Sequence, residues 1–439
     1  MADRHIGRRG FLQLTTAGSA IGFAGCSSIL SGNGNDSDGK GKTISYLSDR
    51  GDSKQIINEI IGEFEKNHDY KVNVTYTSKG TSTDQQLQKM VAAGNPPDLI
   101  FDTSADAYRY QRNGDLAPIS NAVQDNGLPD PVNVDGKSYF APTMVEPLMF
   151  WYRNDLYSSN PETWSKWEKK AKQVSQSNNI EGFVVQSGQT NNADTQITQY
   201  LWQNDVEIYS GPSDNIQITI DDGANRQKAV ETYRWLKTMS QYSPNGSGWE
   251  WGDAIEALQQ ENAAAIASVG GLPILTIAEN RPDLIEKLSP SPFPLPQGKK
   301  QNKWWAYMEG HVVRNDGNAT EGAKAFVDFF SKSDKFMDFV LSAPLFQFPP
   351  TRDGLNSKAV KQNKTIQKHP AVMKLVKENW DSFSTILATG KDGAPNIVAA
   401  DAYGQQLFGQ SADQLLVGGK SPEQTVDWVA KKLQGLKNQ

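Results

Sequence analysis

Hydrophobic positions follow two different periods from residue 43 onwards. Residues 43–47 are predicted to form a strand, and residues 53–67 place isoleucines and a phenylalanine on one helical face. We predict a further strand at 71–76, a helix at 83–93 and a buried strand at 98–101. Strands and helices that alternate in this way indicate an α/β lobe with parallel strands, and ligands of such sheets lie at the carboxyl ends of the strands.

The alternation resumes in the second part of the chain. The further predicted strands are 139–142, 148–152, 182–185 and 263–269. The further predicted helices are 164–175, 225–242, 253–260, 321–331, 335–342, 370–383 and 422–437. A chain of 439 residues exceeds what one hydrophobic core usually organises, so we expect two lobes.

The composition is that of an ordinary soluble protein, with 37% hydrophobic and 21% charged residues. The net charge of -6 gives no basic surface for nucleic acid. Several of the 11 Trp and 14 Tyr residues cluster on turn-rich segments. Aromatic rings usually fill cores, but rings on such segments also suit the C–H-rich face of a sugar.

The N-terminus carries an export pattern. Arg8 and Arg9 form a twin-arginine pair ahead of the weakly apolar residues 12–24, which are too few to span a bilayer. Small residues then lead to Cys26, the sole cysteine, in a sequence that resembles a lipobox, where the thiol receives a lipid. We predict a signal over 1–26, a flexible tether over 27–42, and a protein anchored to the outer face of the cytoplasmic membrane. The alternative is that Cys26 is a free thiol in a cleaved leader.

Further motifs, in order along residues 43–439, resemble the extracellular solute-binding family that includes the maltose-binding and multiple-sugar-binding proteins. The motifs are 97–102, 114–119, 135–142, 146–156, 161–164, 264–271, 325–331, 349–352 and 420–424. One departure is Leu272-Pro273, because members of the family often carry a tryptophan at this point. The pair 304–305, or Trp249 with Trp251, is the candidate replacement for that aromatic platform.

The resemblance implies a fold and a role. The fold is a two-lobe α/β clamp of the periplasmic-binding-protein type, with a ligand cleft and several hinge crossovers. Lobe one is 43–148 plus 307–352, and lobe two is 150–304 plus 358–439. Ligand binding closes the hinge, and the permease of an ABC importer reads the closed form. We therefore expect a monomeric substrate-binding lipoprotein that captures a sugar or oligosaccharide.

Ten residues are candidates for ligand contact: Asp49, Asp102, Glu146, Trp151, Trp249, Trp251, Gly271, Trp305, Glu309 and Arg352. Asp49 and Asp102 follow strands and can accept hydrogen bonds from sugar hydroxyls, or cap the next helix. Glu146 occupies the position of a ligand-contacting glutamate in maltose-type relatives.

The remaining candidates also have alternatives. Trp151 could pack the hinge instead of a ligand, and Trp249 or Trp251 could stack on a sugar from a Gly- and Ser-rich loop. Gly271 allows a close backbone approach. Trp305 and Glu309 surround the second of the expected crossovers between the lobes, near residues 307–310. Arg352 could bind a hydroxyl pair or an anion, or pair with a carboxylate.

Rival functions stay open at this level. A secreted carbohydrate-active enzyme is one, although the sequence contains no Gly-x-Ser-x-Gly, His-Glu-x-x-His, P-loop or dinucleotide motif. A surface adhesion protein is another. The four histidines are scattered, so we expect neither a metal nor a cofactor. Within the binding hypothesis, a sugar phosphate or glycerol phosphate is the alternative ligand, and it would need a basic cleft built from Arg50, Arg153 and Arg352.

Overall fold

The computed structural model describes residues 42–77, 83–124, 131–387 and 395–438. The predicted signal, the lipidation site Cys26 and all but the last residue of the predicted tether lie outside these residues. Within them, no helix combines the length and the apolar character that crossing a membrane requires.

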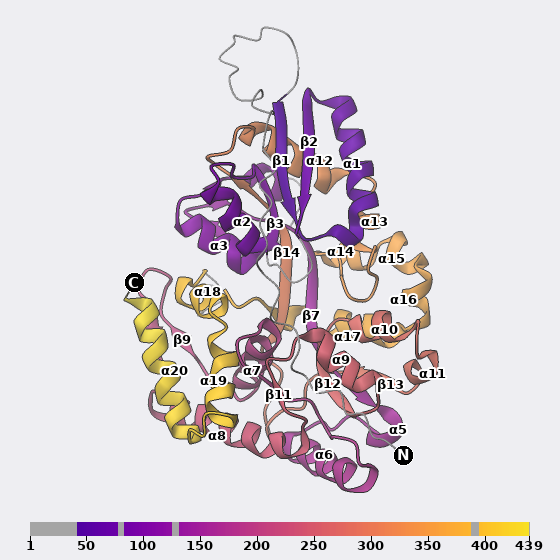
Figure 1. The fold of residues 1–439 in the computed structure, drawn as a ribbon, viewed down its shortest axis with the longest axis vertical. Coiled ribbons are helices and arrows are strands. Elements are labelled where there is room, and N and C mark those ends of the chain that lie inside the picture. Colours follow the sequence, from indigo (N-terminus) through magenta and orange to yellow (C-terminus); the bar gives the residue numbers. More distant parts are fainter. Residues whose placement is uncertain (1–41, 78–82, 125–130, 388–394, 439) are drawn as a thin grey trace, which may run out of the picture. The chain divides into compact units, whose positions relative to one another are not determined.

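The first strands form the parallel sheet that the sequence predicts. β1 (Lys42–Ser48) lies between β2 (Tyr70–Tyr76) and β3 (Leu99–Thr103). The helix α1 (Lys54–Asn67) joins β1 to β2 and buries the isoleucine and phenylalanine face, and α2 (Thr83–Ala92) precedes β3. The carboxyl ends of β1 and β3 therefore lie at one edge of the sheet (Figure 1).

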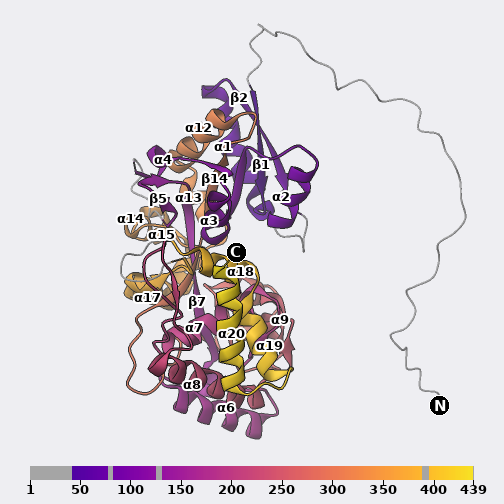
Figure 2. The same cartoon turned by 90° about the vertical axis from the view of Figure 1, so that its left-hand side faces the viewer.

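Two long antiparallel strands continue this sheet. β14 (Trp304–Arg314) pairs with β3 on one side and with β7 (Ala141–Arg153) on the other. The second half of β7 pairs with β12 (Ala265–Val269) and β13 (Leu288–Ser291). The sequence predicts two strands at 139–142 and 148–152, but both halves find ladder partners and form one buried strand. Figures 1 and 2 show β7 and β14 running from the group of β1, β2 and α1 toward the group of α7 and α9.

The remaining elements are mostly helices that cover these strands. They are α3 (Ser104–Arg112), α4 (Ser120–Gln124), α5 (Asn154–Tyr157), α6 (Trp164–Asn178), α7 (Asn191–Gln203), α8 (Gly223–Met239), α9 (Trp251–Gln259), α10 (Leu272–Ile277), α11 (Pro282–Ile285), α12 (Thr320–Lys332), α13 (Phe336–Val340), α14 (Arg352–Leu355), α15 (Lys358–Gln362), α16 (Lys364–Lys368), α17 (Pro370–Asn379), α18 (Ile397–Gly404), α19 (Leu407–Leu416) and α20 (Pro422–Lys437). The short strands are β4 (Leu116–Ala117), β5 (Asn133–Val134), β6 (Lys137–Ser138), β8 (Gln186–Ser187), β9 (Tyr209–Ser210), β10 (Gln217–Ile218), β11 (Gly246–Ser247) and β15 (Phe383–Ser384).

Some predicted elements differ from the structure. Residues 182–185 were predicted as a strand but form no ladder, and the paired segment is β8 instead. The pattern does not predict α7, because this helix is buried from Asn192 to Gln203 and carries polar side chains on every face. The lobe boundaries stay a prediction.

Candidate functional site

Four side chains share one face of the β7–β14 ladder. In the antiparallel register, Glu146 lies opposite Tyr307, and Met144 lies opposite Glu309. Residues two apart on a strand point to the same face, and directly opposite residues share that face. The two glutamates are therefore diagonal neighbours, at a separation that long side chains can bridge.

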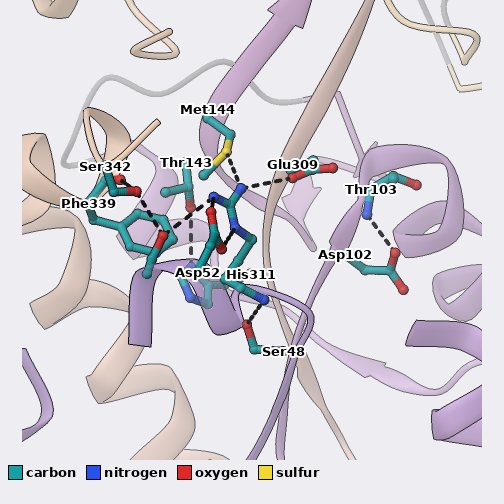
Figure 3. Close-up of polar contacts among 12 residues, drawn as sticks. Ser48, Asp52, Asp102, Thr103, Thr143, Met144, Glu309, His311, Phe339 and Ser342 are labelled. Carbon is teal, nitrogen blue, oxygen red and sulfur yellow. Dashed lines mark hydrogen bonds and ion pairs between the residues drawn. The ribbon is translucent and has the colours of Figure 1, made fainter. Parts of the chain in front are cut away.

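Arg50 covers the Glu309 end of this face. It lies in the loop after β1, is 5% exposed, and donates from Nε and Nη2 to the two oxygens of Asp52, at 3.1 and 2.7 Å. Its Nη1 lies 3.8 Å from Glu309 Oε2 and 3.3 Å from the sulfur of Met144 (Figure 3). The guanidinium thus joins the end of β1 to both long strands.

The electrostatics of this site are those of buried carboxyl groups near one cation. Burial raises the pKa of Glu309 to about 7, with Asp49 adding to the rise and Arg50 opposing it. Burial also raises the pKa of Glu146 well above its usual range, and nearby Glu309 raises it further. Burial opposes the charged form of Arg50, but Glu309 and Asp52 raise its pKa overall.

Glu146 has polar atoms that the protein leaves unpaired. Among the residues that the structure describes, Glu146 Oε1 and the side-chain amide of Gln347 are buried without a hydrogen-bond partner. Gln347 stabilises the charged form of Glu146 and so lowers its pKa, yet no hydrogen bond of ordinary geometry joins the two side chains. Buried polar groups are normally paired, so these atoms indicate a place for an external hydrogen-bond partner.

The two predicted aspartates differ in their surroundings. Asp49 is exposed after β1, and its charge reaches both Glu146 and Glu309. Asp102 is buried and accepts hydrogen bonds from Thr103 N and from the Tyr110 hydroxyl, both at 2.8 Å. Thr103, rather than Asp102, caps the following helix α3. Asp102 therefore has its oxygens engaged within the protein.

The predicted aromatic residues separate into buried and half-buried pairs. Trp151 is fully buried and donates from Nε1 to Gly270 O at 2.8 Å. Trp305 is 1% exposed, and its ring packs near Tyr403. Trp249 and Trp251 are half-buried, at and just before the start of α9. Trp249 and Trp251 thus keep part of their surface accessible.

The last two candidates have their closest contacts within the chain. A Cβ added at Gly271 would lie 2.7 Å from Leu345 Cβ, so the close approach predicted here is made by the protein's own segment. Gly271 N also donates to Leu345 O at 2.7 Å. Arg352 is half-exposed and forms an ion pair with Asp381, which is the carboxylate pairing left open in the sequence analysis.

The opposite face of the same ladder is apolar. Val145, Ala306 and Met308 line a cavity of about 200 Å³ together with Trp380 and Phe383. The structure therefore brings Asp49, Glu146 and Glu309 together with Arg50 and Asp52, and it places an aromatic cavity behind them. Sequence reasoning missed Asp52, Gln347, Trp380 and Phe383. The signal for Asp52 was its position two residues after Arg50 in the strand-end loop.

Comparison with known proteins decides the family. The sequence model of the family described as bacterial extracellular solute-binding protein matches residues 49–335, more than half of the chain. The chain belongs to this family. Its members bind solutes outside the cytoplasm, which fits a role other than catalysis. Within the described residues of this solute-binding protein, no group of three or more His, Cys, Asp or Glu residues could hold a metal ion.

Individual relatives agree with this assignment. The chain is 29% identical to the maltodextrin-binding protein MdxE of Bacillus subtilis over 168 residues, which are 37% of this chain and 38% of that protein. Two similar solved structures are the GacH receptor of Streptomyces glaucescens and maltose-bound MalE3 of T. maritima. The first has a TM-score of 0.71 at 15% identity, over 90% of this chain and 98% of that one. The second has 0.72 at 16%, over 90% and 100%. The predicted two-lobe α/β fold is confirmed.

Proposed function

We propose that this solute-binding protein is the substrate-binding component of an ABC importer, and that it captures a sugar or oligosaccharide and delivers it to the permease. The observation that carries the proposal is the pair Glu146 and Glu309 on adjacent crossing strands, with Glu146 Oε1 lacking a donor from the described protein. Sugar hydroxyls are hydrogen-bond donors, and a carboxylate can accept several of them. MdxE, named as a maltodextrin-binding protein, supports this ligand class.

The crossing strands also suit a hinge. The lobes would be 43–148 plus 307–352 and 150–304 plus 358–439, so that β7 and β14 pass from one to the other. A ligand that bridges the lobes would favour the closed form, because only that form lets both lobes contribute contacts. Asp49 would accept hydrogen bonds from the ligand from the side of lobe one. Asp102 would do so with the lone pairs that Thr103 N and the Tyr110 hydroxyl do not use.

Aromatic side chains would supply the apolar part of sugar recognition. Trp249 and Trp251 are half-buried and keep ring surface for this contact, whereas Trp380 and Phe383 line a cavity on the other face of the ladder. Trp151, Trp305 and Gly271 have their contacts inside the protein. They would affect ligand binding indirectly, by packing beneath the residues that contact the ligand. Arg352 would likewise contribute indirectly, through its ion pair with Asp381.

Anchoring at the membrane completes the proposal. A lipid on Cys26 would hold a monomer at the outer face of the cytoplasmic membrane, where the permease subunits are. Expression of the full chain, followed by membrane fractionation and mass spectrometry of the N-terminal peptide, tests this. Cys26→Ser should release the protein from the membrane fraction. A protein that stays membrane-bound after this substitution would contradict the lipid anchor.

The ligand is tested by isothermal titration calorimetry with glucose, maltose, maltotriose, ribitol and mannitol. We expect saturable binding of at least one of them without product formation. Glu146→Ala should weaken that binding at least tenfold, because it removes a buried carboxyl group whose Oε1 is open to a ligand donor. Glu162→Ala is the matched control, since Glu162 is 71% exposed and pairs only with Lys166 on the surface. Turnover of the sugar, or full affinity in Glu146→Ala, would refute the proposal.

A further inference from the structure

We infer that this site selects its ligand by charge, accepting neutral sugars and rejecting phosphorylated or carboxylated ones. The inference rests on the proposed function and narrows its substrate class. It starts from the balance of charged groups around the ladder face, where Asp49, Asp52, Glu146 and Glu309 surround the single guanidinium of Arg50. Acidic groups thus outnumber basic ones at the place where a ligand would bind.

Arg50 directs its N–H groups at acceptors of the protein. Of its five N–H groups, the one on Nε donates to Asp52 Oδ1, and those on Nη2 to Asp52 Oδ2 and Ser53 Oγ. The two on Nη1 face Met144 Sδ at 3.3 Å and Glu309 Oε2 at 3.8 Å. A phosphate at Nη1 would share the guanidinium with the Glu309 carboxylate, 3.8 Å away, and would meet its negative charge. Arg50 therefore holds the acidic groups in place and does not serve as an anion receptor.

The other arginines suggested for a basic cleft are also engaged. Arg153 is buried and lies 2.7 Å from both Asp155 and Glu261. Arg352 pairs with Asp381. Both guanidinium groups pair with carboxylates, so the three arginines that the sequence suggested for a basic cleft do not form one free of acidic partners.

Two further sources of positive potential in neighbouring segments face groups of the protein. Lys54 lies over the Tyr76 ring, with Nζ 5.7 Å from its centre. The N-terminus of α3 could attract an anion through its helix dipole, but Thr103 Oγ1 accepts from Asp106 N there. The Asp106 carboxylate also lies in that first turn. An anion at the end of β3 would therefore meet negative charge.

The consequence for ligand choice is direct. A sugar hydroxyl that donates to Glu146 satisfies Oε1, which the described part of the protein leaves unpaired. A phosphate or carboxylate enters a partly buried region where acidic groups outnumber the guanidinium of Arg50, and each of those groups that is ionised repels it. An ammonium group, as in an amino sugar, brings the favourable sign.

The test pairs each neutral ligand with a charged counterpart of the same skeleton. Glucose is compared with glucose 6-phosphate, glucuronate and glucosamine, maltose with maltose 6′-phosphate, and mannitol with mannitol 1-phosphate, all by calorimetry at low salt. We expect the anionic member to bind at least about 100-fold more weakly than its neutral partner. We expect glucosamine to bind no more weakly than glucose. An anionic ligand that binds within threefold of its neutral partner overturns the inference and leaves the proposed function standing. If no sugar binds, both fail.

A variant checks the role given to Arg50. Asp52→Asn removes the carboxylate that occupies Nε and Nη2, and Asp52 is more than half exposed, so the fold should tolerate the change. The gap between glucose 6-phosphate and glucose should narrow by about tenfold, since a freed guanidinium can bind phosphate. Glu162→Gln, on the surface, should leave the gap unchanged. An unchanged gap in Asp52→Asn would show that Arg50 does not control the charge preference.

Discussion

A buried carboxyl group on α7 offers the sharpest physical test of the structure. Asp194 is fully buried, and its Oδ1 accepts hydrogen bonds from Phe408 N at 2.7 Å and Gly409 N at 3.4 Å. Both N–H groups belong to the first turn of α19, which cannot satisfy them internally. Asp194 thus acts as a cap supplied by a distant helix, and it ties α19 to α7.

Burial raises the pKa of Asp194 to about 8, while the hydrogen bonds from Phe408 and Gly409 oppose the rise. In the unfolded chain the pKa is about 3.9. The folded protein therefore binds one more proton than the unfolded protein between these two values. Stability from this group is fully present below about pH 4 and is lost as the pH rises toward 8, by about 1.4 kcal/mol per pH unit. Between pH 5 and pH 7 the loss is about 2.7 kcal/mol.

Asp194→Asn keeps the acceptor oxygen and cannot ionise. Its free energy of unfolding, measured by urea denaturation with circular dichroism, should gain about 2.7 kcal/mol relative to the wild type between pH 5 and pH 7. Asp194→Ala removes the acceptor and should lose about 1–3 kcal/mol of stability, because two buried N–H groups lose their partner. Asp222→Asn, at an exposed position before α8 without a side-chain capping bond, is the control.

The result that refutes this reasoning is simple to recognise. If the difference between the wild type and Asp194→Asn stays constant from pH 5 to pH 7, Asp194 is ionised in the folded protein. The pH dependence would then have to come from other groups. If Asp222→Asn changed the pH dependence of the free energy of unfolding by the same amount, the effect would not be specific to the buried site. That result would also refute the reasoning.

Three further substitutions probe the hinge and the site. Gly270→Ala should lower the free energy of unfolding by about 3 kcal/mol, because Gly270 has a φ of +45° and the new Cβ would lie 2.5 Å from Phe346 O. An unchanged melting temperature would contradict this prediction. Asp401→Asn removes an ion pair with Arg109 whose two groups are 3.8 Å apart and about one third exposed. Such pairs contribute little, so sugar affinity should change by less than about fivefold. A larger change by calorimetry would mean that Asp401 contributes to sugar binding. Sugar affinity should rise from pH 6 to pH 8, since hydroxyl donors favour the ionised form of Glu309, and Glu309→Gln should abolish the rise.

The regular periods of the first lobe made its elements predictable. The isoleucine face of 53–67 has a single buried side, and it forms α1 as expected. The helix α7 has no exposed side and buries Thr195, Gln196 and Gln199, whose partners come from distant segments such as Tyr307. No local pattern distinguishes such a polar helix from a loop, because the hydrogen bonds that make its burial possible are tertiary.

The site was predictable only where a motif carried it. Glu146 stood out by its place in a motif, and Asp49 by its position after a strand. The sequence could not show that Arg50 would pair with Asp52 and Glu309, because that depends on where the end of β1 meets β7 and β14. For the same reason, the buried Trp151 and the half-buried Trp249 could not be told apart.

The placement of Glu146 and Glu309 on strands has a thermodynamic consequence for the empty protein. Ladder partners on both sides fix the backbone of β14, and β14 together with the Val145–Phe348 bridge fixes that of β7 near Glu146, so these carboxyl groups cannot turn toward water without disrupting the sheet. Buried and incompletely paired, they destabilise the unliganded fold as they ionise, as their raised pKa values indicate. Ligand hydroxyls would remove part of that destabilisation in addition to forming their own contacts. Rigid positioning of these groups therefore favours tight sugar binding at the expense of stability in the unliganded state.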